Sequence, residues 1–290
     1  MMKYTITGAT GHLGSQITKQ LHQLVPADQI NLGVHTPAKA QHFADLGMTL
    51  HAIDYADEAS LITALQNSDV FIYVPSKSHD SYSRVTELEH VIAAAEQAHV
   101  QKMVAMGFVA DQTDNPFTLS AFYGYLPRRL AETDLDYVIL RNVLYADPLV
   151  PYLPELIERG NIIYPVGHHA MSFISLADSA EAFAKVATTP ALFRRKKSYT
   201  LSQSRDYTMP QLAEVLSKVS GHHIGYAPVT NAEFEQLYDQ NHEGKMLASM
   251  YAGGAMGLLD DLSDDFEQIT GHPAQTMTAF LTKQWQQKGL

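Results

Sequence analysis

The sequence contains no cysteine, which excludes a disulfide scaffold, a thiolate metal centre and a cysteine nucleophile. It has no run of eighteen apolar residues, so it predicts neither a membrane-spanning helix nor a membrane partner. Basic side chains are scarce, because 20 lysines and arginines stand against 31 acidic residues, for a net charge of −11. Nucleic-acid binding needs clustered basic side chains and is therefore not expected. No charged leader with a cleavage site opens the sequence, so we expect a cytoplasmic protein.

The first half of the chain alternates short apolar runs with amphipathic segments. The apolar runs predict strands at 4–7, 30–34, 48–53, 70–74, 103–106 and 137–140, with helices between them. Strands that alternate with helices indicate right-handed crossovers and a parallel sheet covered on both faces. The sequence therefore predicts an α/β fold, a doubly wound parallel sheet of the Rossmann type over 1–147.

The second half is less regular. Prolines at 148, 151, 154 and 165 predict that the chain leaves the main sheet there. A helix and a strand near 174–201 are expected to return to it. Later helices are expected near 209–219, 231–240, 244–256 and 275–287. We therefore expect 148–290 to form a smaller, mostly helical substrate-binding lobe.

A glycine-rich turn lies directly between the first strand and the first helix. Gly8, Gly11 and Gly14 meet three needs of a dinucleotide site: a tight turn, backbone close to a pyrophosphate, and close helix–strand packing. The helix N-terminus adds free N–H groups for the phosphates. The lysine of a nucleotide-hydrolysing loop is absent. The alternative is a merely tight turn between a strand and a helix that binds no ligand.

The residue that follows the second strand distinguishes the two nicotinamide cofactors. An acid about 20 residues after the last glycine holds the ribose hydroxyls of NAD. This chain has His35 there and Lys39 close by, without an acid. Positive partners favour the 2′-phosphate of NADP(H), so NADP(H) is expected over NAD(H). In the alternative interpretation, Lys39 is an ordinary exposed helix lysine.

Several segments together resemble one known family. These are Thr7-Gly8-Ala9-Thr10-Gly11-His12-Leu13-Gly14, Val34-His35-Thr36-Pro37-Ala38-Lys39-Ala40, Asp54-Tyr55 and Leu140-Arg141-Asn142. The sequence resembles the NmrA-like atypical short-chain dehydrogenase/reductases, and within them type-2 NAD(P)H:quinone oxidoreductases and triphenylmethane reductase. Two positions depart from the family. His35 stands where arginine is common, and Met106-Gly107-Phe108 lacks the usual hydroxyl.

The resemblance implies a Rossmann domain, a small substrate lobe and a bound NADP(H). It places cofactor contacts on Gly8, Thr10, Gly11, His12, Leu13, Gly14, His35, Val74, Pro75, Ser76, Gly107 and Asn142, with Asp54 and Tyr55 near the adenine.

Tyrosine-dependent relatives use a Tyr-x-x-x-Lys helix as their acid/base pair. Here Tyr125 is followed by Arg129, and Tyr123 by Pro127. Arginine neutralises a phenolate but does not release a proton as lysine does. Tyr123, Tyr125 and Arg129 are therefore weak catalytic candidates. We also expect Pro127 to interrupt the helix.

Aromatic residues downstream of strand ends are candidates to line an acceptor site: Phe108, Phe122, Tyr123, Tyr145 and Tyr152. Plain core packing is the alternative for each. No metal site is expected, because adjacent histidine pairs point apart and no HExxH occurs.

The leading hypothesis is an NAD(P)H-dependent reductase that delivers hydride to a quinone-like or other conjugated small molecule. One alternative is a non-catalytic redox sensor that binds the dinucleotide and regulates a protein partner. Another is an enzyme like the nucleotide-sugar epimerases, which share the glycine-rich turn.

Overall fold

The structure, a computed structural model, describes residues 1–239 and 243–288. Its chain divides into two compact units. The first consists of Met1–Gly107, Phe122–Arg141 and Leu176–Tyr199, and the second of Phe108–Ala121, Asn142–Ser175 and Thr200–Leu290. The chain therefore passes between the units several times. The division at residue 147 expected from the sequence stays a prediction.

The first unit is built on a seven-stranded parallel sheet in the order β10-β6-β5-β4-β1-β2-β3. The predicted Rossmann-type α/β fold is thus confirmed. From β1 the chain builds outward through β2 and β3, and β4 then pairs with the other side of β1. The strand order reverses at this point, and ligands of open α/β sheets bind beside the carboxyl ends of strands at such a switch. The strands are β1 (Tyr4–Thr7), β2 (Ile30–Val34), β3 (Thr49–Ala52), β4 (Val70–Tyr73), β5 (Lys102–Phe108), β6 (Asp136–Asn142) and β10 (Lys197–Leu201).

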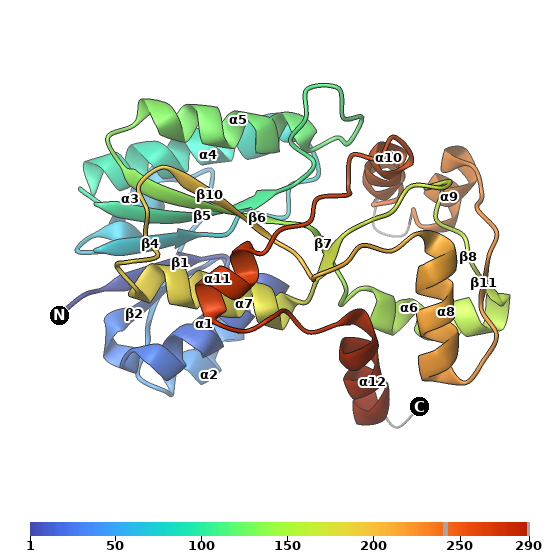
Figure 1. The fold of residues 1–290 in the computed structure, drawn as a ribbon. Helices are drawn as coiled ribbons and strands as arrows, with labels where there is room; N and C mark the ends of the chain where they lie inside the picture. Colours follow the sequence, from blue (N-terminus) through green and yellow to red (C-terminus); the bar gives the residue numbers. More distant parts are fainter. Residues whose placement is uncertain (240–242, 289–290) are drawn as a thin grey trace. The chain divides into compact units, whose positions relative to one another are not determined.

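Helices cover both faces of this sheet (Figure 1). α1 packs against α7 on one face, and α3 packs against α4 on the other. The inner strands β1 and β4 are buried along their whole length, whereas the edge strand β3 is partly exposed. This explains why the inner strands read as continuous apolar runs. The helices are α1 (His12–Leu24), α2 (Gln41–Ala44), α3 (Glu58–Leu65), α4 (Ser81–Gln97), α5 (Ser120–Glu132) and α7 (Leu176–Thr188), with 3₁₀ turns η1 (Ala27–Gln29) and η2 (Pro37–Ala40).

The second unit is mostly helical, as predicted for the C-terminal part. Its two small sheets pair β11 with β8 and β7 with β9. The predicted helix near 231–240 corresponds to α9, and residue 240 lies outside the described residues. The elements are β7 (Leu144–Tyr145), α6 (Leu149–Arg159), β8 (Asn161–Ile162), β9 (Phe173–Ile174), α8 (Met209–Ser220), β11 (Gly225–Tyr226), α9 (Asn231–Leu237), α10 (Gly244–Ala255), α11 (Asp265–Thr270) and α12 (Met277–Lys288).

The expectation that Pro127 interrupts its helix was wrong, whereas the segment 148–165 does leave the main sheet, as its prolines predict. The proline-rich segment after 148 contains helix α6, because Pro151 occupies the first turn, where the backbone N–H has no partner within the helix. Pro154 lies inside α6, whose buried stripe of leucines, with Leu153 and Leu156 at its centre, stabilises the helix by packing. Helix α5 likewise continues through Pro127 instead of ending there. Tertiary packing overrides the local cost of both prolines.

In the described ranges, no helix is long and apolar enough to cross a membrane. Those same ranges hold no group of three or more histidine, aspartate or glutamate side chains arranged to bind a metal ion.

Candidate functional site

The glycine-rich turn links β1 to α1 at the switch point of the sheet. Gly8 has φ +65°, a left-handed conformation that glycine adopts without steric cost. A Cβ on Gly8 would lie 3.1 Å from the carbonyl oxygen of Val74, at the end of β4. A Cβ on Gly14 would overlap the Gly8 carbonyl oxygen and lie 2.7 Å from its carbon. The turn therefore has no room for side chains at these positions.

The first turn of α1 presents backbone N–H groups at the same edge. Its N-cap residue, Gly11, makes no side-chain cap hydrogen bond, and the Gly11 N–H donates to Gly8 O at 2.9 Å. Thr10 and His12 are exposed beside the turn, whereas Leu13 and Gly14 are buried. The helix start has no side-chain cap, and the glycines beside it leave backbone exposed where any side chain would intrude. Such an arrangement can accommodate a pyrophosphate. The residues present therefore fit a dinucleotide cofactor.

The end of β4 is fixed beside this turn by hydrogen bonds to the backbone of Val74. The Tyr55 hydroxyl donates to Val74 O at 2.6 Å, and Thr7 Oγ1 accepts from Val74 N at 3.4 Å. Burial raises the pKa of Tyr55, so its phenol stays neutral and remains a donor. The Tyr55 ring thus points toward β4. Asp54 is exposed, and its carboxylate accepts from Ala56 N at 2.9 Å.

The loop after β4 is held by two charged residues of α4. Glu87 accepts hydrogen bonds from the hydroxyls of Ser76 and Ser78, the latter at 2.6 Å. Arg84 Nε donates to Ser78 O at 2.7 Å, and its Nη1 donates to the Tyr123 hydroxyl at 3.2 Å. The buried Pro75 precedes these contacts. This network orders a segment that the sequence analysis assigns to the cofactor.

Replacing Glu87 by alanine is expected to weaken NAD(P)H binding about fivefold, because two serine hydroxyls lose their acceptor and the loop loosens. Titration calorimetry of the folded variant measures this effect. Glu87→Gln keeps an acceptor and is expected to fall between the variant and the parent. Equal affinity in all three proteins would show that the loop does not contribute to the site.

The second strand ends next to the first, because Gly33 pairs with Thr7. His35 and Lys39 follow that end, and both side chains are exposed. His35 Nδ1 lies 3.4 Å from the Thr36 hydroxyl. The predicted determinants of cofactor choice are thus at the correct edge of the sheet for a dinucleotide.

Gly107 and Asn142 belong to different units. A Cβ on Gly107 would lie 2.8 Å from Cγ2 of Ile139 and 3.3 Å from Cγ of Arg141, so close packing of β5 on β6 accounts for this glycine. Asn142 is fully buried in the second unit, where its carbonyl accepts from Val109 N at 3.0 Å.

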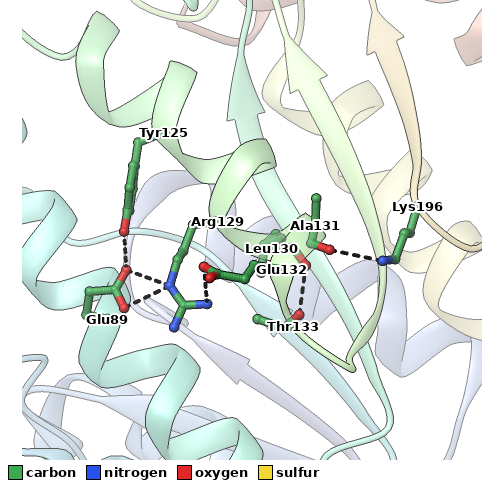
Figure 2. A network of polar contacts seen from close by, with 8 residues as sticks. All are labelled: Glu89, Tyr125, Arg129, Leu130, Ala131, Glu132, Thr133 and Lys196. Carbon is green, nitrogen blue, oxygen red and sulfur yellow. Dashed lines mark hydrogen bonds and ion pairs between the residues drawn. The ribbon is translucent and has the colours of Figure 1, made fainter.

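Tyr125 and Arg129 both bind the carboxylate of Glu89 (Figure 2). The Tyr125 hydroxyl donates to Glu89 Oε1 at 2.7 Å, and Arg129 Nε lies 2.9 Å from Glu89 Oε2. The hydrogen bond to Glu89 raises the pKa of Tyr125, the opposite of the shift that an acid/base tyrosine needs. Glu132 lies 3.6 Å from Arg129 Nη1. This arrangement favours a structural role linking α4 to α5.

Tyr125→Phe is therefore expected to leave turnover within about twofold of the parent and to lower stability by no more than about 1 kcal/mol. Steady-state kinetics and thermal unfolding measure the two effects. A loss of about 1,000-fold in kcat would instead assign Tyr125 a role in proton transfer.

Phe122 and Tyr123 are buried in the first unit. Their rings are 5.0 Å apart, and the Arg84 guanidinium lies 5.7 Å from the centre of the Phe122 ring. Both side chains therefore belong to the network around α4.

The other three acceptor candidates meet in one cavity. This cavity has a volume of about 290 Å³ and lies within the second unit. Phe108, Tyr145 and Tyr152 line it, together with Phe173 of β9. Around them are residues that the sequence analysis missed: Tyr164, Phe234, Tyr238, Glu243 and Tyr251.

The missed residues come from α9, α10 and the segment after β8. Tyr164 stacks on Tyr251 with ring centres 4.8 Å apart, and Phe234 packs edge-on against Tyr251 at 5.1 Å. Each lies far along the chain from the ends of the predicted parallel strands, which is why no local pattern indicated it.

Comparison with known proteins settles the family. A sequence profile described as NAD(P)H-binding matches residues 8–190, well over half of the chain. The chain belongs to the NmrA-like NAD(P)H-binding family. This match confirms the resemblance to the NmrA-like family that the sequence motifs indicated.

Quinone oxidoreductase 2 of Escherichia coli strain K12 is 32% identical over 276 residues, covering 94% of this NmrA-like chain and 95% of that protein. Its crystal structure with NADPH has a TM-score of 0.88 at 31% identity and covers 97% of this chain and 99% of that one. Triphenylmethane reductase of Citrobacter sp. with NADP(H) has a TM-score of 0.89 at 26% identity, covering 98% and 99%.

A Staphylococcus aureus structure described as a nucleoside-diphosphate-sugar epimerase is 37% identical. Its TM-score is 0.92, and the match covers 97% of this chain and 100% of that one. Homologues of the NmrA-like chain are thus NAD(P)H-dependent oxidoreductases at modest identity, alongside one structure with a different description.

Proposed function

We propose that this protein is an NAD(P)H-dependent reductase that passes a hydride to a quinone-like or other conjugated small molecule. The observation that most strongly supports this proposal is the aromatic cavity of the second unit, which is lined by Phe108, Tyr145 and Tyr152. Flat conjugated acceptors bind between aromatic rings through stacking and apolar burial. Homologues with quinone and dye reductase names support the same class.

The chain's own residues have limited chemistry to perform in this reaction. The glycine-rich turn and the uncapped start of α1 would hold the pyrophosphate, and the loop after β4 is ordered by Glu87 and Arg84. When bound, NAD(P)H would supply the hydride; a quinone would then take one proton from solvent to become the hydroquinone, whereas a cationic dye would be neutralised by the hydride alone. An electrophilic acceptor needs positioning and exclusion of water more than it needs a strong acid. Helix α5 has no Tyr-x-x-x-Lys pair, because Tyr125 is followed by Arg129, and this is compatible with such chemistry.

We further propose NADP(H) as the preferred cofactor. The exposed His35 and Lys39 at the end of β2 offer positive charge to a 2′-phosphate, and no acid stands there to hold free ribose hydroxyls.

Binding and turnover measured on one sample test the proposed function. We expect NADPH to bind in calorimetry and to be oxidised when a panel of quinones is added. Tight binding without oxidation of NADPH by any quinone or cationic dye would overturn the reductase and favour a redox sensor. An epimerase would instead interconvert nucleotide sugars and lose that activity in Tyr125→Phe.

A further inference from the structure

Two groups at the wall of the tyrosine-lined cavity accept hydrogen bonds, Glu243 and the oxygen of Tyr238. Glu243 lines the cavity and carries a carboxylate. The Tyr238 hydroxyl donates its hydrogen to Glu155 Oε1 at 2.8 Å. Because that hydrogen is committed to Glu155, the Tyr238 oxygen offers only lone pairs to any other group. Both groups suit a ligand that presents hydrogen-bond donors or positive charge.

Negative charge from two carboxylates reaches the cavity wall. Burial raises the pKa of Tyr152, and the charges of Glu243 and Glu155 raise it further. An opposing cation is Arg159, whose Nη2 lies 2.9 Å from Glu155 Oε1. The Arg159 and Glu155 side chains are 37% and 36% exposed, so solvent screens both charges alike, and Glu243 is the carboxylate that lines the cavity itself. Among the described residues that line the cavity, none is a lysine or an arginine.

The aromatic faces add to this preference. Tyr164 and Tyr251 stack at an interplanar angle of 12°, and Tyr152 meets Tyr238 edge-on with centres 5.6 Å apart. Each ring face carries negative charge from its π electrons, which attracts cations and electron-poor rings. Desolvation inside a cavity strengthens this attraction.

We propose that the cavity selects its conjugated acceptor by charge, accepting cationic and neutral rings and rejecting anionic ones. Glu243 acts at the wall, and Glu155 acts as a positioning residue through Tyr238. This inference rests on the proposed function, since it names the class of acceptor that the same reductase uses. Sulfonated or carboxylated acceptors are therefore poor substrates even when their ring systems fit.

Three matched ligands test the selection: a naphthoquinone, its sulfonate and its trimethylammonium derivative. Calorimetry measures their dissociation constants without any need for turnover. Steady-state kinetics with NADPH then give kcat and KM for each. We expect the cationic form to bind about fivefold to tenfold more tightly than the neutral form, and the sulfonate to bind more weakly by a similar factor.

Variants that neutralise one carboxylate at a time test which residue sets the preference for the cationic quinone. Glu243→Gln and Glu155→Gln are each expected to reduce the preference for the cation over the sulfonate about fivefold, through KM rather than kcat. In Glu155→Gln the side-chain amide oxygen still accepts the hydrogen of Tyr238, so packing is retained. Glu158→Gln removes the same charge from the exposed face of α6 and is the matched control, with the parent's preference expected.

The outcomes separate the two proposals. Binding of the sulfonate as tight as the neutral quinone overturns charge selection, as does an unchanged preference in both glutamine variants. If the ligands rank as expected but no NADPH is oxidised, the reductase fails while charge selection stands. Turnover of all three quinones with equal KM supports the reductase and overturns the selection.

Discussion

Gly14→Ala is expected to weaken NAD(P)H binding by more than about 100-fold, equivalent to about 2.7 kcal/mol. The added methyl group would overlap the Gly8 carbonyl oxygen and lie 3.0 Å from the Cα of Ala9. These neighbours are backbone atoms, so relief requires α1 to move away from β1. That movement displaces the N–H groups that receive the pyrophosphate. Overpacking of this kind also lowers the free energy of unfolding, by about 2 kcal/mol.

Two further glycine variants make this result interpretable. In Gly11→Ala, the new Cβ lies 3.2 Å from the Gly8 carbonyl oxygen, so a smaller loss of affinity is expected. Gly221→Ala has open space but φ +73°, and costs about 1 kcal/mol of stability with no change in cofactor binding. Calorimetry on folded protein gives the dissociation constants. Near-parent affinity in Gly14→Ala would show that the turn does not hold the dinucleotide.

The sheet could be predicted from the sequence because its signals are local. Strands such as Val70–Tyr73 are buried on both faces and therefore read as continuous apolar runs. The glycine-rich turn was recognisable for the same reason, since Gly8 has a left-handed φ and Gly14 lies against the backbone of Gly8 and Ala9. A local rule also produced the error at Pro127, where packing of α5 outweighs the lost backbone hydrogen bond.

The cavity could be predicted only in part, because its wall is assembled from distant segments. Tyr145 lies near a strand end and was found, whereas Tyr164, Tyr238 and Tyr251 reach it through packing of elements that no local pattern connects. The hydrogen-bond partner of Tyr125 could not be predicted from the sequence for the same reason. That partner, Glu89, stands on α4, 36 residues away along the chain, and no local pattern links the two residues.

His35→Asp is expected to reverse the cofactor preference of the protein. His35 follows β2, beside the end of β1, at the position where an acid holds the ribose hydroxyls of NAD(H). An aspartate there repels a 2′-phosphate, so NADPH affinity is expected to fall about 10- to 100-fold. NADH affinity is expected to rise, because the new carboxylate accepts hydrogen bonds from the two hydroxyls.

His42→Asp is the matched control, since His42 is also exposed and lies on α2, away from the strand end. It changes the same charge and is expected to alter NADPH affinity less than about threefold, as screening requires at that distance. His35→Arg places a permanent positive charge at the same position and should strengthen NADPH binding while leaving NADH unchanged. If His35→Asp lowers the affinities for NADPH and NADH equally, the residue contacts a part common to both cofactors. The proposed NADP(H) preference would then rest on Lys39 alone, and Lys39→Ala would be expected to abolish it.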